Sequence, residues 1–362
     1  MKRTITTFSA VCVFVSVALA EGGKIEHTTF LSQALEKNML GDSPSREVLV
    51  YLPPSYDSNE AKRYPVVYLL HGNSAGWAGK INPAYTWARD REAKDGRPAT
   101  RGVKTIMDDL VKKGQAKEMI VVMPNGRNKY RGSHYVNSPV TGNWADHIAK
   151  DLVAFIDKKY RTLNGRNSRA LAGYSMGGRG TFILGMKYPD VFGVIYAMSG
   201  GAMNFGKLPE SPENVVAWKN VLALNNLENA DSQSIRLLGM SAAFSPNPKN
   251  KPFPVDFQYS LVDGKWRPNS EVQKRWWRFD PIEMVESHKD ALLSLNGFRF
   301  DCGRFDTLVV DANRALVKSL KKANIPHEYS EYDARHGEKR NWRLEQTVLP
   351  YFSKKLKFSD RE

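Results

Sequence analysis

The sequence predicts an α/β fold in which helices cover both faces of a mostly parallel central sheet. Short apolar runs recur along the chain, as expected of strands that are buried on both faces. Apolar residues at helical spacing lie between several of these runs, and such alternation of strands and helices is typical of parallel sheets. The 362 residues, 41% of them hydrophobic, suffice for one large domain with a buried core.

The expected strands are the apolar runs, several of them ended by turn-forming residues. The first spans residues 46–51 before Pro53, and the second spans residues 64–70 before His71 and Gly72. The remaining runs are residues 119–123, 169–172 and 194–199, with two further strands near residues 298–302 and 327–332.

Two helices are indicated by apolar stripes. Residues 148–160 place Ile148, Leu152 and Ile156 on one face, and Asn143 is expected to cap the start of this helix. A second stripe consists of Leu308, Ala312, Ala315, Leu316 and Leu320.

Residues 1–20 have the pattern of an export signal. Lys2 and Arg3 precede a largely apolar stretch, and Ala18 and Ala20 form a small-residue cleavage site. We therefore expect residues 21–362 to form the exported domain, in the periplasm or the medium. No membrane anchor is expected, because no other stretch approaches the ~20 apolar residues that span a bilayer.

Residues 201–296 interrupt the alternation of strands and helices. They are rich in proline, asparagine and aromatic residues, and they are too long for a simple connection. This region is therefore expected to be an insertion, with a lid over the substrate site and a peripheral excursion as the two alternatives.

Composition argues against several classes of partner. The net charge of +15 comes from scattered basic residues, so no nucleic-acid partner is expected. Cys302 is the one cysteine after residue 20, which rules out an internal disulfide in the exported domain. No cluster of histidine and cysteine has the spacing of metal ligands, and no cofactor is expected.

Residues 173–177 read Gly-Tyr-Ser-Met-Gly, between an apolar run and a helical pattern. This G-x-S-x-G pattern predicts a sharp, strained turn with small flanking residues that raises Ser175 above the sheet as a nucleophile. The N–H of Met176, at the start of the helix, is expected to face developing negative charge. The backbone N–H of Asn73 is the expected second donor of this oxyanion hole, with Gly72 as the alternative.

A serine nucleophile needs a base and a carboxylate, and these follow the G-x-S-x-G serine in the order acid, histidine. His336 follows the last expected strand and is the candidate base, whereas His327 begins that strand and is expected to be structural. Asp306 is the candidate acid, on a turn after the preceding strand. Asp301 is its rival, with a buried structural carboxylate as the other interpretation.

Four segments in order resemble the esterase D family of α/β-hydrolases. They are residues 50–56 (Val-Tyr-Leu-Pro-Pro-Ser-Tyr), 69–72 (Leu-Leu-His-Gly), 173–178 (Gly-Tyr-Ser-Met-Gly-Gly) and 301–306 (Asp-Cys-Gly-Arg-Phe-Asp). That family includes feruloyl and acetyl-xylan esterases, S-formylglutathione hydrolase, enterochelin esterases and the antigen 85 mycolyltransferases. The resemblance covers about residues 26–355 apart from much of the insertion.

The resemblance implies an α/β-hydrolase fold with Ser175 as nucleophile, Asp306 as acid and His336 as base. It also brings residues 135–144 near the active site. Two segments depart from the family: Asn73-Ser74-Ala75 stands where many members have a longer glycine run, and Ala334-Arg335 stands where many have glycines.

The expected function is an exported serine carboxylesterase acting on short-chain or carbohydrate-linked acetyl or feruloyl esters. Tyr135, Trp144 and Trp276 are candidate substrate-binding residues, and a place in the core is the alternative for each. An acyltransferase with the same triad is a second hypothesis. A third is a binding module without catalysis on a hydrolase scaffold, which an intact triad disfavours.

Overall fold

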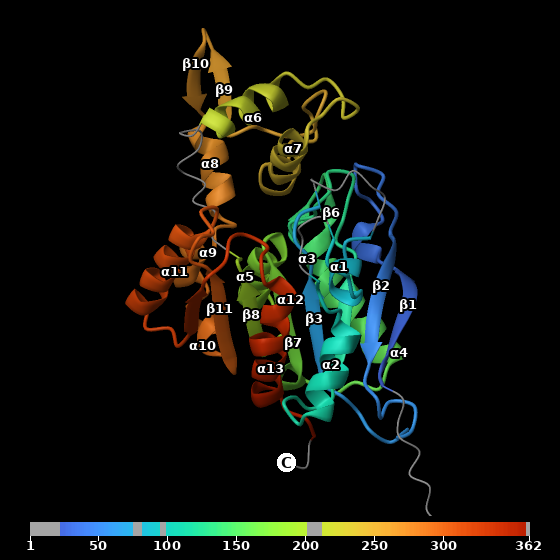
Figure 1. Ribbon diagram of the computed structural model, residues 1–362. Coiled ribbons are helices and arrows are strands. Elements are labelled where there is room, and N and C mark those ends of the chain that lie inside the picture. Colours follow the sequence, from blue (N-terminus) through green and yellow to red (C-terminus); the bar gives the residue numbers. More distant parts are fainter. Residues whose placement is uncertain (1–21, 75–81, 95–98, 201–211, 360–362) are drawn as a thin grey trace, which may run out of the picture.

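The computed structural model describes residues 22–74, 82–94, 99–200 and 212–359, around a central sheet (Figure 1). In the described residues this sheet has eight strands in the order β1-β2-β4-β3-β7-β8-β11-β12. The strands β3, β4, β7, β8, β11 and β12 are parallel, and at one edge β2 runs antiparallel to both of its neighbours, β4 and β1. Their bounds are β1 Lys24–Leu31, β2 Ser45–Leu52, β3 Val66–Leu70, β4 Ile120–Pro124, β7 Arg169–Tyr174, β8 Val194–Met198, β11 Gly297–Gly303 and β12 Glu328–Tyr332.

The expected mostly parallel sheet is confirmed, but β1 is not among the strands expected from the sequence. This edge strand pairs with β2 along its whole length, from Lys24 opposite Leu52 to Leu31 opposite Ser45. Polar and apolar residues mix along it, and most of them are exposed or half-buried. Continuous apolar runs are typical of strands that are covered on both faces, and β1 has no such run.

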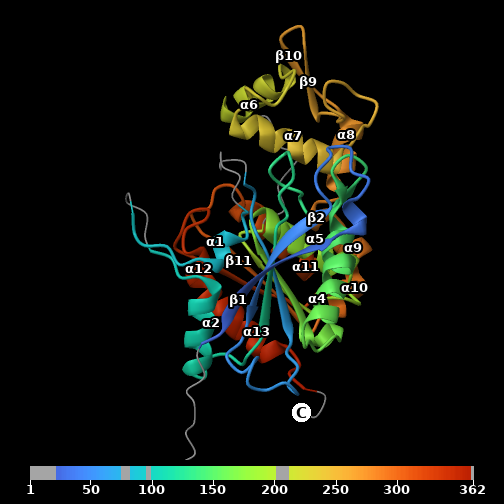
Figure 2. The same cartoon turned by 90° about the vertical axis from the view of Figure 1, so that its right-hand side faces the viewer.

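Side chains alternate across the sheet and feed two cores. In β3, Val66, Tyr68 and Leu70 enter one core, and Val67 and Leu69 enter the other. Figure 2 shows α4 and α9 to α11 on one side of the sheet and α1, α2 and α12 on the other. The bounds of the covering helices are α1 Tyr85–Ala88, α2 Val103–Lys112, α4 Val153–Lys159, α5 Met176–Lys187, α9 Pro281–Ser287, α10 Lys289–Leu293, α11 Val310–Lys322, α12 Arg340–Arg343 and α13 Leu349–Lys355.

The expected helix near 148–160 is present and begins earlier. It runs through α3 (Trp144–Asp146), a π-helical segment (His147–Leu152) and α4. Asn143 occupies the position before the helix, but its side chain makes no capping hydrogen bond. Instead Asn137 Oδ1 accepts from the N–H groups of Ala145 and Asp146, at 3.0 and 3.1 Å.

The second expected stripe is correct except at its start. Helix α11 begins at Val310, and Leu316 and Leu320 are buried in the core. Leu308 lies before the helix with 69% of its surface exposed, so its assignment to the buried stripe was wrong.

The region 201–296 contains two kinds of structure, and its residues 201–211 lie outside the described part. Helices α6 (Pro212–Leu222) and α7 (Ser232–Phe244) and the hairpin of β9 (Tyr259–Val262) and β10 (Lys265–Pro268) share a small core, to which Tyr130 and Val140 from outside the region also contribute. Figure 1 shows these elements stacked beyond one end of the central sheet. Helix α8 (Ser270–Trp277) connects them to α9 and α10, which cover the sheet itself.

The remaining short elements are β5 (Asn137–Ser138), β6 (Gly142–Asn143), the turns of 3₁₀-helix at Gln33–Leu35 and Arg166–Ser168, and a π-helical segment at Leu344–Val348. None of the helices in the described segments combines the length and apolar character needed to cross a bilayer. Residues 1–20, expected to be an export signal, lie outside the described part.

Candidate active site

Ser175 stands at the junction of β7 and α5 with φ 55° and ψ −115°. Its N–H donates to Met198 O at 3.0 Å, which ties the turn to β8. A Cβ on Gly173 would lie 2.3 Å from Gly177 O, and one on Gly177 would lie 2.4 Å from Leu70 O. The turn therefore has the strained backbone and the small flanking residues that the sequence motif predicts.

Ser175, His336 and Asp306 form a continuous hydrogen-bonded chain. His336 Nε2 lies 2.9 Å from Ser175 Oγ, and His336 Nδ1 lies 2.7 Å from Asp306 Oδ2. A carboxylate only accepts, so Nδ1 carries the proton and Nε2 is left to accept from the serine hydroxyl. Asp306 is 1% exposed, and the ring of Tyr174 packs 5.1 Å from that of His336.

The turn that carries Asp306 is bound to the loop that carries His336. The N–H of Phe305 donates to Ala334 O at 3.2 Å. A Cβ on Gly303 would lie 2.1 Å from the same oxygen, so only glycine allows this approach. This contact keeps the two catalytic candidates adjacent although 30 residues separate them.

Asp301, the rival acid, is paired elsewhere. Its Oδ2 accepts from Tyr196 Oη at 2.5 Å and from Arg343 Nε at 2.9 Å, and also from Arg343 Nη2. Asp301 is fully buried, and burial raises the pKa of its carboxyl while the Arg343 guanidinium opposes that shift. The structure thus supports the interpretation of Asp301 as a structural carboxylate.

The loop after β3 carries Asn73, the candidate donor. His71 is buried, its Nδ1–H donates to Gly72 O at 2.7 Å, and its Nε2 accepts from Gly126 N at 2.9 Å. Burial lowers the pKa of His71 to about 4, so the ring is neutral at pH 7 and can make both bonds. Asn73 Nδ2 lies 4.0 Å from Met176 Sδ, so the two expected oxyanion residues are neighbours.

The three aromatic residues expected to bind substrate are fully buried. Tyr135 Oη donates to His71 O at 3.0 Å and Trp144 Nε1 donates to Thr141 O at 2.7 Å. Trp276 Nε1 donates to Ser245 Oγ at 2.7 Å. Side chains with no exposed surface and with satisfied polar atoms do not contact a substrate, so this expectation was wrong for all three.

Residues 126–135 form a loop that bonds the chain on both sides of Asn73, and no motif in the sequence marks them as a unit. In this loop Arg131, His134 and Tyr135 all have positive φ, at 62°, 54° and 56°. The sequence signal was weak, because the turn residues Pro124 and Gly126 show only where the preceding strand ends.

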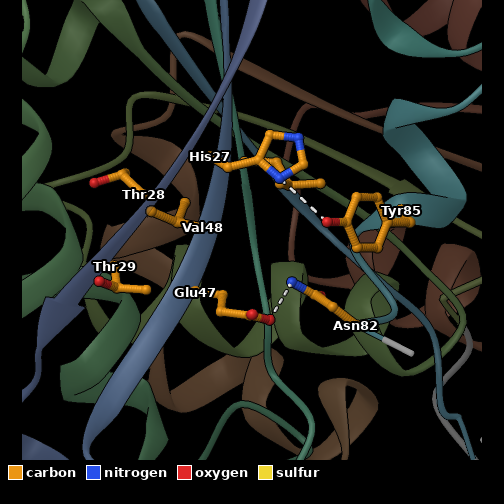
Figure 3. Close-up of a pocket in the computed structure, with 8 residues that line it drawn as sticks. His27, Thr28, Thr29, Glu47, Val48, Asn82 and Tyr85 are labelled. Atoms are coloured by element: carbon orange, nitrogen blue, oxygen red, sulfur yellow. Dashed lines mark hydrogen bonds between the residues drawn. The ribbon is translucent and has the colours of Figure 1, made fainter. Parts of the chain in front are cut away.

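A separate hollow of about 310 Å³ opens between β1, β2 and the chain around α1 (Figure 3). Two hydrogen bonds cross it: Asn82 Nδ2 donates to Glu47 Oε2 at 3.0 Å, and Tyr85 Oη lies 3.1 Å from His27 Nδ1. None of the three candidate catalytic residues lines it. Over the described segments, no group of three or more His, Cys, Asp or Glu side chains could hold a metal ion.

Comparisons with known proteins find matches among esterases. The family model "Esterase", described as "Putative esterase", matches residues 43–347. An endo-1,4-beta-xylanase/feruloyl esterase of Xylanibacter ruminicola is 27% identical over 228 residues, which are 61% of this chain and 27% of that protein. Esterase Rv1288 of Mycobacterium tuberculosis is 27% identical over 311 residues, 83% of this chain and 54% of that protein. This chain therefore spans about half, or less, of the length of these relatives.

Solved structures show the same fold. A ferulic acid esterase has a TM-score of 0.60 at 25% identity, covering 93% of this chain and 99% of that one. An S-formylglutathione hydrolase from Agrobacterium tumefaciens has a TM-score of 0.56 at 15% identity, covering 93% of this chain and 96% of that one.

Proposed function

This chain belongs to the Esterase family and has an α/β-hydrolase fold, and from this premise we propose that it is a serine carboxylesterase with Ser175 as its nucleophile. The observation that carries the proposal is the hydrogen-bonded chain from Asp306 through His336 to Ser175. The strained turn at Ser175 supports it further, because such a backbone persists at sites where function requires it.

In the proposed reaction Ser175 Oγ attacks the ester carbonyl while His336 Nε2 takes its proton. Asp306 holds the Nδ1–H tautomer and stabilises the imidazolium that forms. His336 then returns the proton to the departing alcohol, and water releases the acyl group by the same steps. No step requires a metal ion or a cofactor.

The backbone N–H groups of Met176 and Asn73 would hold the oxyanion of the tetrahedral intermediate. Met176 is the first residue of α5, where backbone donors have no carbonyl of the helix to bind. The side chain of Ser175 does not cap this end of the helix. Removing one such donor costs about 3 kcal/mol of transition-state stabilisation.

The proposed substrates are short-chain or carbohydrate-linked acetyl or feruloyl esters, as the names of the feruloyl esterase relatives suggest. Neither nucleic acid nor a membrane anchor is part of the proposal. Because residues 1–20 have the pattern of an export signal, we place the enzyme in the periplasm or the medium. Sequencing of the exported protein should find Glu21 as its first residue, and an uncleaved chain would contradict export through this signal.

The test compares hydrolysis of p-nitrophenyl acetate, butyrate and octanoate and of methyl ferulate by the wild type, Ser175→Ala and His336→Ala. Both variants should lose kcat by about 10⁴-fold or more. His327→Gln is the matched control, since His327 Nδ1 bonds Ile325 O, and its kcat should stay within about 3-fold of the wild type. A folded wild type that turns over none of these esters would refute the esterase and favour an acyltransferase or a binding module.

A further inference from the structure

The loop of residues 126–135 holds an unfavourable backbone close to Ser175. Arg131, His134 and Tyr135 are non-glycine residues with positive φ, and each such conformation has an energetic cost. Three of them within five residues persist only where surrounding contacts fix the loop.

One set of contacts joins this loop to the chain that carries Asn73. Ser74 donates twice to Arg131 O, from its N–H at 3.1 Å and from its Oγ at 2.6 Å. On the other side of Asn73, His71 accepts from Gly126 N at its ring and from Tyr135 Oη at its carbonyl. The residues on both sides of Asn73 are therefore hydrogen-bonded to one loop.

The loop also touches both residues of the proposed oxyanion hole. A Cβ on Gly132 would lie 2.5 Å from Asn73 Nδ2 and 2.8 Å from Met176 Sδ. The backbone of Gly132 thus lies against Asn73 and Met176 together, so a shift of the loop moves one relative to the other.

A second set of contacts joins the loop to the helix of the nucleophile. His134 Nδ1 lies 2.6 Å from Arg179 Nη2 and accepts from it. Arg179 is 2% exposed on α5, one turn after Ser175, and its N–H donates to Ser175 O at 2.9 Å. The ring of Phe244 from α7 lies 5.0 Å from the guanidinium carbon of Arg179 and 5.3 Å from the ring of His134.

Because both residues are buried, Arg179 is the donor and His134 is the acceptor of this hydrogen bond. His134 is 2% exposed, and burial lowers its pKa well below the ordinary value, with the Arg179 charge acting in the same direction. The ring is therefore neutral and its Nδ1 is an acceptor. Hydrogen bonds that involve a charged donor are stronger than neutral ones, which suits this pair to holding a strained loop.

We propose that His134 and Arg179 are a positioning pair that fixes loop 126–135 on α5 and thereby sets the place of Asn73 relative to Met176. This role rests on the proposed esterase function. Neither residue is a catalytic residue, because each acts through the loop. Since the oxyanion forms only in the reaction, a misplaced donor should lower kcat and leave KM nearly unchanged.

The test removes the acceptor and then restores it. His134→Leu replaces the ring with an apolar side chain of similar size that has no hydrogen-bond acceptor. We expect its kcat for p-nitrophenyl butyrate to fall roughly 10- to 100-fold, with KM within about 3-fold of the wild type. His134→Asn places an oxygen near the position of Nδ1 and tolerates positive φ, so its kcat should recover to within about 5-fold of the wild type. Arg179→Met should resemble His134→Leu, and Arg179→Lys should lie between it and the wild type.

Ser138→Ala is the control, because it removes other buried hydrogen bonds next to this loop. Ser138 Oγ donates to Ala242 O at 2.6 Å and accepts from the N–H groups of Val140 and Thr141 at 3.1 and 3.4 Å. This substitution should leave kcat unchanged. Loss of activity in Ser138→Ala equal to that in His134→Leu would mean general destabilisation and would overturn the proposal, as would a normal kcat in His134→Leu.

A second readout needs no turnover. The N–H of Ser74 is bonded to Arg131 O, and its hydrogen exchange should become about 10-fold faster or more in His134→Leu and not in Ser138→Ala or His134→Asn. Unchanged exchange at Ser74 would overturn the proposal whether or not the protein is an esterase. If the folded wild type hydrolyses no ester, the proposed function fails, and the exchange rates still decide whether the pair holds the loop.

Discussion

Asp301 and Asp306 are five residues apart, and the same substitution is expected to affect a different property at each of them. Asp306 bonds His336, and Asp301 bonds Arg343 and Tyr196. Replacing each carboxylate by an amide of the same shape, in Asp306→Asn and Asp301→Asn, removes a charge and little volume. The first change should impair catalysis, and the second should lower stability.

In Asp306→Asn the amide can donate to His336 Nδ1, which favours the tautomer with the proton on Nε2. That nitrogen then faces Ser175 Oγ at 2.9 Å as a donor and cannot take the serine proton. The same change in a Ser-His-Asp triad lowers kcat by about 10⁴-fold. This factor corresponds to about 5 kcal/mol of transition-state stabilisation.

In Asp301→Asn the guanidinium of Arg343 loses its buried partner, while the amide oxygen still accepts from Tyr196. Removing one member of a buried ion pair costs about 3–5 kcal/mol, and we expect the lower end because hydrogen bonds remain. The free energy of unfolding should therefore fall by about 3 kcal/mol, with kcat within about 3-fold of the wild type.

The assay pairs urea unfolding at pH 7 with turnover of p-nitrophenyl acetate for both variants and the wild type. Near-normal turnover in Asp306→Asn would refute the assignment of the acid. A folded Asp301→Asn that loses activity by 10³-fold or more would transfer that role to Asp301.

Three further substitutions test burial. His147 stacks 5.3 Å from Phe30, burial lowers its pKa to about 3, and neither ring nitrogen has a partner in the described residues. His147→Phe should raise the free energy of unfolding by about 1–3 kcal/mol at pH 8. The gain should be larger at pH 5, because there the histidine of the unfolded wild type takes up a proton. Equal or lower stability of the variant in urea would contradict this. Burial raises the pKa of Asp280 to about 7, so its stabilising contribution is full below about pH 4 and is lost as pH rises towards 7. Unfolding in urea across this range should show the wild type losing up to about 4 kcal/mol relative to Asp280→Asn, which keeps the helix cap, and parallel profiles would refute it. Trp276→Phe should leave KM unchanged and cost about 1 kcal/mol through the bond to Ser245, and a KM raised more than about 3-fold would return Trp276 to the substrate site.

Features that depend on local backbone and on burial on both faces could be predicted from the sequence. The turn at Ser175 was predictable because Gly173 and Gly177 are required wherever a strand meets a helix this closely. The central strands were predictable because both of their faces are apolar. The edge strand β1 was missed because only part of its surface is covered.

Burial of individual aromatic residues could not be read from the sequence. Trp276 is covered by Phe244, whose ring lies 5.3 Å away and comes from another helix of the same region. A tryptophan in a chain rich in aromatic residues is equally compatible with a core and with a substrate site. The choice depends on which segments pack over it.

By itself the sequence determined the class of fold, the candidate nucleophile and the order of the candidate serine, acid and base along the chain. These follow from periodicity and from short motifs, which act over a few residues. Only the tertiary structure placed Asp306 beside His336 and Asp301 beside Arg343, and joined His134 to Arg179. Their partners lie 30 to 45 residues away along the chain, and His336 meets Ser175 across 161 residues. Hydrogen bonds form over about 3 Å, so contacts between such distant residues depend on how the whole sheet and its loops pack.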